Sequence, residues 1–167
     1  MKSNLFIFLH LNLLSIFVVS FSYSQEYNYA TLDELYDNGT QSSFEEVTGW
    51  WSGRCFQKDE PNKPLAFLLM AAETDAKHLA IVSDFESDSA PDRYDQLSET
   101  DRAIFERFMN SQEFKSMEVS FADNAIYSHL GRGVQAIKKS GNQFVGVLRH
   151  SLDKDYNYNC FFFKKVK

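Results

Sequence analysis

The chain has 167 residues, 44% of them hydrophobic and 16% aromatic, which suits one globular domain with a substantial core. Its 17 basic and 23 acidic side chains give a net charge of −6. Proteins that bind nucleic acid or an anionic membrane surface need clustered positive charge, so neither is expected as a partner.

The first 24 residues have the features of a cleavable export signal. A single lysine precedes a mostly apolar stretch, residues 5–19, and Ser22 and Ser24 have the spacing that signal peptidases accept. The stretch is shorter than the roughly 20 residues that span a bilayer, although a retained membrane anchor is the alternative. We expect cleavage after Ser24 and one periplasmic or extracellular domain over residues 25–167, with no membrane span.

Residues 25–48 are predicted to form a helical segment that precedes the sheet. Thr31 and Glu34 have the spacing of a capping box, with Thr31 as the N-cap. Asn38 and Gly39 then end the helix in the manner of a C-terminal glycine. Apolar side chains at helical spacing indicate that this short helix lies against the domain.

After position 48 the apolar residues alternate with a period of two, which is typical of β-strands. The first strand, residues 49–58, carries Trp51 and Cys55 on one face and Trp50 on the other. Residues 64–70 are continuously apolar, which predicts a strand buried on both faces, with a buried helical turn as the alternative. The remaining strands are expected at residues 77–85, 115–121, 125–130, 134–139, 143–150 and 156–166.

A second helix is predicted between the third and fourth strands, at about residues 98–110. An acidic connection, residues 86–96, leads into it. Ser98 is its expected N-cap, with Asp101 at the third helical position. Its apolar stripe has the spacing of a helix that buries one face against a core.

The last third of the chain consists of short strands joined by tight turns, and about eight strands without strand–helix–strand alternation predict a mainly β fold with an antiparallel meander. Cys55 in the first strand and Cys160 in the last are the only cysteines, which in an exported protein are most simply a disulfide. A disulfide needs Cα atoms within roughly 7 Å, so the ends of the meander should meet. We therefore expect a small barrel over residues 49–167, with a two-layer β-sandwich as the alternative.

The segment Gly49-Trp50-Trp51 resembles the Gly-x-Trp pattern on the first strand of lipocalins and related calycin barrels. A short preceding helix and the first-to-last closure are similar too, whereas a helix in mid-chain departs from the family. The resemblance implies that the tryptophan packs at the closed end of the barrel beneath a basic side chain from near the C-terminus. Lys164 and Arg149 are the candidates for that side chain. It also implies a ligand cavity in the barrel mouth.

No catalytic motif accompanies this pattern. His78, His129 and His150 have no metal-binding spacing, and neither His-Glu-x-x-His nor Gly-x-Ser-x-Gly occurs. We interpret the histidines as surface or half-buried residues. An enzyme with a dispersed site would instead need one of them close to an acid in a cleft.

The acidic connection contains a possible calcium loop. Five carboxylates occupy positions 1, 3, 5, 9 and 12 of a twelve-residue window, the ligand spacing of an EF-hand loop. These residues are Asp84, Glu86, Asp88, Asp92 and Asp95. Ser89 stands where the loop needs glycine, so a solvated acidic loop is the alternative, and no other cofactor is expected.

Aromatic residues gather on the first and last strands, and their side chains are the candidate ligand contacts. The set is Trp50, Trp51, Tyr156, Tyr158 and Phe162. A core covered by a helix is the alternative reading of these residues. The leading hypothesis is an exported, non-enzymatic binding module for an apolar small molecule or a partner protein, with a protein-interaction or inhibitor domain as the alternative.

Overall fold

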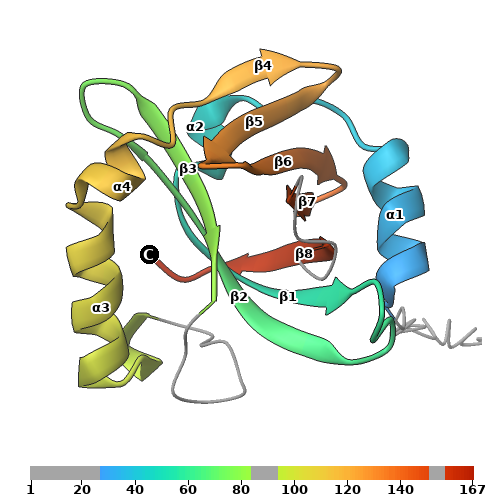
Figure 1. The fold of residues 1–167 in the computed structure, drawn as a ribbon, viewed down its shortest axis with the longest axis horizontal. Coiled ribbons are helices and arrows are strands. Elements are labelled where there is room, and N and C mark those ends of the chain that lie inside the picture. Colours follow the sequence, from blue (N-terminus) through green and yellow to red (C-terminus); the bar gives the residue numbers. More distant parts are fainter. Residues whose placement is uncertain (1–26, 84–93, 151–156) are drawn as a thin grey trace, which may run out of the picture.

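The structure is a computed structural model and describes residues 27–83, 94–150 and 157–167, to which all statements below refer. The fold is mainly β, as expected (Figure 1). The strands are β1 (Gly49–Gln57), β2 (Pro64–Glu73), β3 (Lys77–Val82), β4 (Ser120–Ala122), β5 (Ala125–Leu130), β6 (Gly133–Ser140), β7 (Gln143–His150) and β8 (Asn157–Lys165). The helices are α1 (Tyr29–Asp37), α2 (Phe44–Val47), α3 (Glu99–Met109) and α4 (Gln112–Lys115), and a single 3-10 turn, η1, spans Tyr94–Gln96.

The eight strands form one antiparallel sheet that curls into a half-barrel. Their order is β3-β2-β1-β8-β7-β6-β5-β4, so the first and last strands are neighbours and the two edges are β3 and β4. The expected meander of eight strands with first-to-last closure is therefore confirmed. Between β3 and β4 the chain leaves the sheet, and α3 and α4 are inserted there.

Short contacts span the gap between the two edges of the sheet. The Leu79 amide donates to the carbonyl of Met117 (3.1 Å), and the Val119 amide donates to the carbonyl of Lys77 (2.9 Å). The carbonyl of the same Leu79 accepts the hydroxyl of Ser128 on β5 (2.6 Å). The outer edge of β3 thus finds hydrogen-bond partners although no full strand pairs with it, as the backbone groups of a largely buried strand require.

Apolar side chains form a core inside the half-barrel and further clusters outside it. The interior cluster holds inward-facing residues of β1, β2, β3 and β5–β8 together with Phe44 and Val47 of α2. Outside, α3 and α4 cover β1–β3, and α1 covers the opposite part of the sheet (Figure 1). Both faces of β2 are therefore buried, which explains its continuously apolar sequence and confirms it as a strand.

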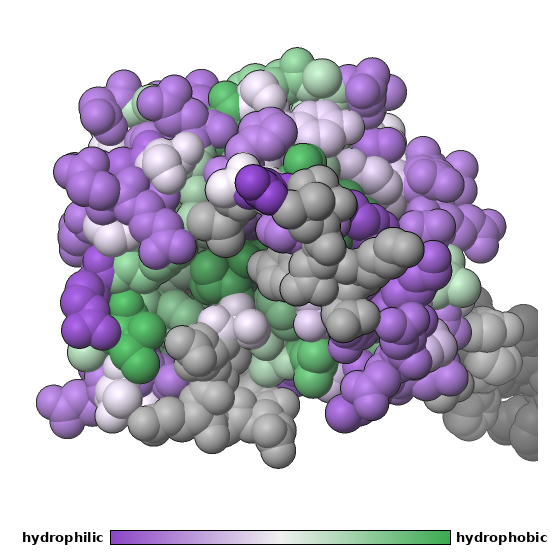
Figure 2. All heavy atoms as spheres, in the orientation of Figure 1, coloured by the Kyte–Doolittle hydropathy of each residue, from purple (hydrophilic) through white to green (hydrophobic). Residues whose placement is uncertain are grey.

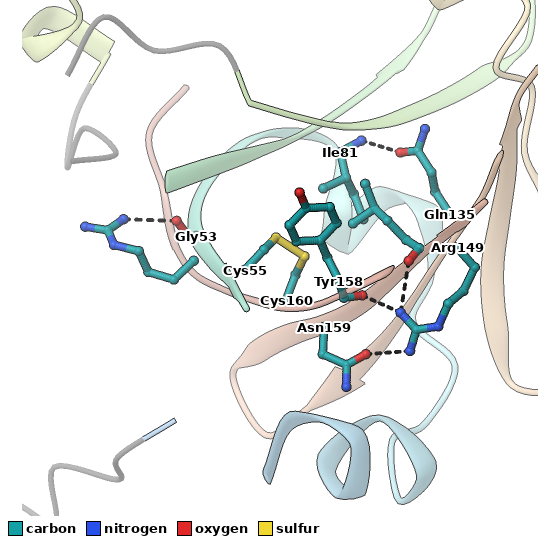
Figure 3. The surroundings of a disulfide bond; sticks show 10 residues. Gly53, Cys55, Ile81, Gln135, Arg149, Tyr158, Asn159 and Cys160 are labelled. Atoms are coloured by element: carbon teal, nitrogen blue, oxygen red, sulfur yellow. Dashed lines mark hydrogen bonds between the residues drawn. A yellow bond between two sulfur atoms is a disulfide. The ribbon is translucent and has the colours of Figure 1, made fainter. Parts of the chain in front are cut away.

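Cys55 and Cys160 form a disulfide at the seam between β1 and β8 (Figure 3). The two residues are direct register partners, with Cα atoms 4.0 Å apart, and both are fully buried in the interior cluster. The predicted bond is confirmed. It covalently fixes the contact that closes the meander.

Helix α1 is fastened to the outer face of β8 by polar contacts. The Asn159 side-chain amide donates to the carbonyl of Tyr29 (2.8 Å) and to the Asp33 carboxylate (3.1 Å). Arg149 donates in turn to the Asn159 side-chain oxygen (2.6 Å), as Figure 3 shows. Asn159 is fully buried, and this network satisfies its polar atoms.

The capping of α1 differs from the prediction. Asn28, and not Thr31, is the N-cap, and Thr31 takes the third helical position, where its hydroxyl accepts the Asn28 amide. The box is thus shifted by one turn, because the threonine hydroxyl fills the role usually taken by Glu. Gly39 lacks the left-handed conformation of a C-terminal glycine. It is needed instead because a Cβ there would lie 2.8 Å from the Cβ of Lys138.

The strand predicted at residues 115–121 is wrong in its first half. Ser111 caps the short helix α4, with its hydroxyl accepting the Phe114 amide, so Lys115 is helical. The segment that follows makes one bridge to β3, and only residues 120–122 pair with β5. The alternation of Met117 and Val119 reflects packing against two different clusters.

The mid-chain helix is confirmed. Ser98 caps α3 by accepting the Asp101 amide (2.9 Å), and the apolar stripe of the helix faces β1–β3. Most of the acidic connection before it lies outside the described residues. None of the helices in the described ranges is long and apolar enough to cross a bilayer.

Candidate functional site

One end of the half-barrel is closed by α2. The Ser43-x-x-Glu46 capping box, which the sequence analysis overlooked, forms this single-turn helix. The Trp51 indole points inward and donates to the carbonyl of Val47 (2.8 Å) while its ring meets the edge of Phe144. Helix α2 therefore plugs this end, and Trp51 holds the plug in place.

Gly49 lets the C-terminal segment pass close to this end. Its φ of +114° is unfavourable for other residues, and a Cβ there would lie 2.4 Å from the Lys167 carbonyl. The chain end is held by the Trp50 amide, which donates to that carbonyl (2.9 Å). The glycine of the Gly-x-Trp pattern is thus required in this fold because a larger residue would collide with the C-terminal segment.

A basic side chain covers each tryptophan, but neither is one of the two expected. The Lys165 ammonium lies 5.9 Å from the Trp51 ring, and the Lys167 ammonium lies 4.8 Å from the Trp50 ring. Lys164 is displaced because a register shift at Ser52/Gly53 places Lys165 opposite Trp51. Arg149 fails because it faces outward, 5.9 Å from the Tyr29 ring.

The opposite end of the half-barrel is lined by inward-facing apolar and aromatic side chains. Phe67 and Tyr158 meet there with ring centroids 5.5 Å apart, and Leu65 packs beside them, partly buried. In Figure 3 the Tyr158 ring lies in the interior beside the disulfide, with Gln135 across from it. We call this the open end, because no described helix covers it.

Two polar side chains lie buried inside the half-barrel near this end. Ser128 and Gln135 are register partners on β5 and β6, and both reach the edge of β3. Gln135 accepts the Ile81 amide through its side-chain oxygen. Its residue is 2% exposed, and its side-chain nitrogen has no hydrogen-bond partner among the described residues.

The residues predicted to contact a ligand lie in different parts of the structure. Trp51, Tyr158 and Phe162 face the interior, Trp51 at the closed end and Tyr158 at the open end. Trp50 faces outward and is buried under α3, with its ring 6.2 Å from that of Phe105. Tyr156 lies outside the described residues. Their role as ligand contacts stays a prediction.

The sequence analysis did not identify Gln135 and Ser128 as buried polar residues, although the pattern of their strands could have indicated it. Both occupy inward positions in strands whose other inward residues, such as Ile126 and Ile137, are apolar. A polar residue on the buried face of a strand needs a partner, which marks it for closer inspection.

The three histidines after the predicted leader do not lie together in one site. The expectation of surface or half-buried histidines is wrong for His78, which is fully buried against Phe114. Its Nε2 lies 3.4 Å from an Asp75 carboxylate oxygen. Asp75 sits on the exposed β2–β3 turn, where mainly the Thr74 hydroxyl lowers its pKa to about 2. His129 is exposed, and His150 lies two strands away from it on β7. The His78–Asp75 pair is therefore a turn contact and does not lie in a cleft.

The predicted calcium loop lies almost entirely outside the described residues. Of its five carboxylates only Asp95 is described, exposed on η1. Elsewhere in the described ranges, no three His, Cys, Asp or Glu side chains lie close enough together to hold a metal ion.

The surface seen in Figure 2 has a recessed apolar area near its middle, bordered in part by hydrophilic side chains. The eight-stranded half-barrel, its plugged end and its tryptophan beneath a lysine are compatible with a lipocalin-like fold.

Comparison with family models, with curated proteins and with solved structures finds no significant match to this chain.

Proposed function

We propose that this protein is an exported, non-enzymatic binding module that takes a small, largely apolar molecule at the open end of a lipocalin-like half-barrel. The observation that carries the proposal is the Gln135 side-chain nitrogen, a buried donor without a partner among the described residues. An unpaired buried donor is unfavourable by about 1–3 kcal/mol, so native structures rarely retain one without a reason.

The interior side chains of the open end and Gln135 together define the chemistry of the ligand. Phe67, Tyr158 and Leu65 offer apolar and aromatic contacts, and the amide nitrogen offers one hydrogen bond. Such sites combine a mostly apolar lining with a few polar groups that fix orientation. The matching ligand is apolar and carries one acceptor, such as a carbonyl oxygen.

The leader-like features of the first 24 residues and the disulfide support the proposed export. A buried disulfide persists in oxidising compartments and is uncommon in the cytosol, and the bond between Cys55 and Cys160 fits that location.

The protein-docking version of the proposal has less support. Within the described ranges the only exposed large apolar side chain is Phe121, 45% exposed on the short edge strand β4. Stable protein interfaces need contiguous patches of several hundred Å², and a single ring does not supply one. We therefore favour the small molecule.

The test begins with the oxidised protein purified without its leader and examined by native mass spectrometry for a bound molecule. The protein is then titrated with 6-propionyl-2-(dimethylamino)naphthalene, a neutral fluorescent probe with one carbonyl acceptor. We expect saturable binding that Leu65→Glu abolishes and that the matched surface variant Phe121→Glu leaves unchanged. Circular dichroism checks that both variants are folded.

A second pair of variants isolates the hydrogen bond. Gln135→Glu keeps an acceptor for the Ile81 amide but removes the amide donor, whereas Ser128→Ala removes the neighbouring bridge and leaves the donor in place. Weaker binding in the first and unchanged binding in the second support the proposal. Equal binding by all four variants, or loss with Phe121→Glu alone, would contradict it.

A further inference from the structure

A polar groove with a volume of about 610 Å³ lies at the closed end of the half-barrel, away from the open end. The groove is formed where the α2 segment meets the end of β2, the start of β3 and the end of β8. Its lining residues are Ser43, Phe44, Glu45, Thr48, Glu73, Lys77 and Lys165.

Both lysines of the groove are placed by aromatic rings. The Lys77 ammonium lies 5.7 Å from the centroid of the Phe44 ring, and the Lys165 ammonium lies 5.9 Å from that of Trp51. Among the described residues neither ammonium forms an ion pair. Their positive charges are therefore available to a ligand.

The two carboxylates of the groove are available as well. Glu73 is the register partner of Lys77, yet the two side chains form no ion pair, and Glu45 makes no described polar contact. The adjacent Glu46 provides the contrast. It binds Lys139, Ser42 and the Ser43 amide, and these contacts, the lysine first, lower its pKa to about 2.

The backbone around the groove is held in place. The Thr48 hydroxyl and amide both donate to the carbonyl of Phe44, at 2.9 and 3.0 Å, which fixes the end of α2. The carbonyl of Lys77 accepts the Val119 amide (2.9 Å), and Lys165 pairs with Trp51 across the β1–β8 seam. The charged groups thus project from four anchored segments.

We propose that this groove binds a small zwitterion, a free amino acid or a short peptide. Two lysines would receive its carboxylate, Glu73 and Glu45 would receive its ammonium, and Phe44 offers an apolar surface between them. The two lysines and two glutamates of the lining have a net formal charge of zero. A ligand with only one charge would therefore leave either the two ammonium groups or the two carboxylates without an opposite charge. The volume falls within the range of known ligand sites.

The experiment compares charge patterns on one scaffold. Isotope-labelled, oxidised protein is titrated in separate NMR experiments with phenylalanine, with the dipeptide Phe-Ala, with 3-phenylpropionate and with 2-phenylethylamine. We expect shifts in the amide signals of Thr48, Glu73, Lys77 and Lys165 at millimolar concentrations of the zwitterions, and several-fold weaker binding of the two singly charged analogues. A preference between phenylalanine and the dipeptide identifies the length of the ligand.

Neutral variants then assign the contacts. Lys77→Gln and Glu73→Gln should each weaken zwitterion binding several-fold, whereas Lys63→Gln, an exposed lysine of the β1–β2 turn, should not. Equal affinity for the singly charged analogues, or no shifts at these residues with any of the four compounds, would overturn the proposal. Because the groove and the open end lie at opposite ends of the half-barrel, either proposal can fail without the other.

Discussion

The disulfide between Cys55 and Cys160 should supply a large share of the stability of this fold. It closes a loop with a sequence separation of 105 residues. In the chain-entropy model a loop of that length lowers the entropy of the unfolded chain enough to stabilise the folded state by about 4.8 kcal/mol at 25 °C. Small domains have a total stability of about 5–15 kcal/mol, so the bond could decide whether the domain is folded.

The perturbation is the double variant Cys55→Ala, Cys160→Ala, studied beside the wild-type protein with and without a reducing agent. Urea unfolding followed by tryptophan fluorescence gives the free energy of unfolding by linear extrapolation. We expect a loss of about 4–5 kcal/mol on reduction, and a somewhat greater loss in the double variant, because both sulfur atoms leave a fully buried cluster.

Reductant should have no effect on the double variant, which makes it the internal control. A loss below about 1 kcal/mol on reduction of the wild-type protein would refute the reasoning. It would mean either that the cysteines are not bonded or that the unfolded chain already keeps the ends of β1 and β8 together.

Three further predictions concern single residues. Ser128→Ala should lower the free energy of unfolding by about 0.5–1.5 kcal/mol in the same urea assay, because the carbonyl of Leu79 loses its hydroxyl donor. The Lys139 ammonium beside Glu46 is the main reason that the pKa of this carboxyl falls from 4.5 to about 2. Its stabilising effect should be complete above pH 4.5 and disappear as the pH falls from there to about 2, so Glu46→Gln should flatten the pH dependence of stability in that window. Gly49→Ala should destabilise the protein by about 1–3 kcal/mol and Gly131→Ala by less, measured as thermal unfolding, since a Cβ at the second position would meet no atom within 4 Å.

Much of the sheet could be predicted from the sequence because its signals are local. The β6–β7 hairpin, with Gly141 at a φ of +60°, follows from its turn residues, and β7 begins and ends where expected. The alternation in β1 correctly places Trp51 and Cys55 on the face opposite Trp50, and the structure shows that the first two lie inside the half-barrel. Alternation succeeds here because each face of the strand meets a different apolar layer.

The features that the sequence did not reveal depend on contacts between distant segments. The lysine above Trp51 was misplaced by one residue because an irregularity in strand pairing leaves no mark on the periodicity of either strand. The role of Gln135 depends on β3 lying across the gap from β6, a separation of 54 residues. The closed-end groove combines four segments, none of which carries a motif by itself.

Binding of an apolar molecule with one acceptor at the open end can be observed through intermolecular NMR contacts with the bound fluorescent probe. We expect nuclear Overhauser effects from the probe to the Leu65 methyl groups and the Tyr158 ring, which line that end. Contacts confined to Phe121 or to other exposed side chains, with none to the inward-facing residues, would contradict it.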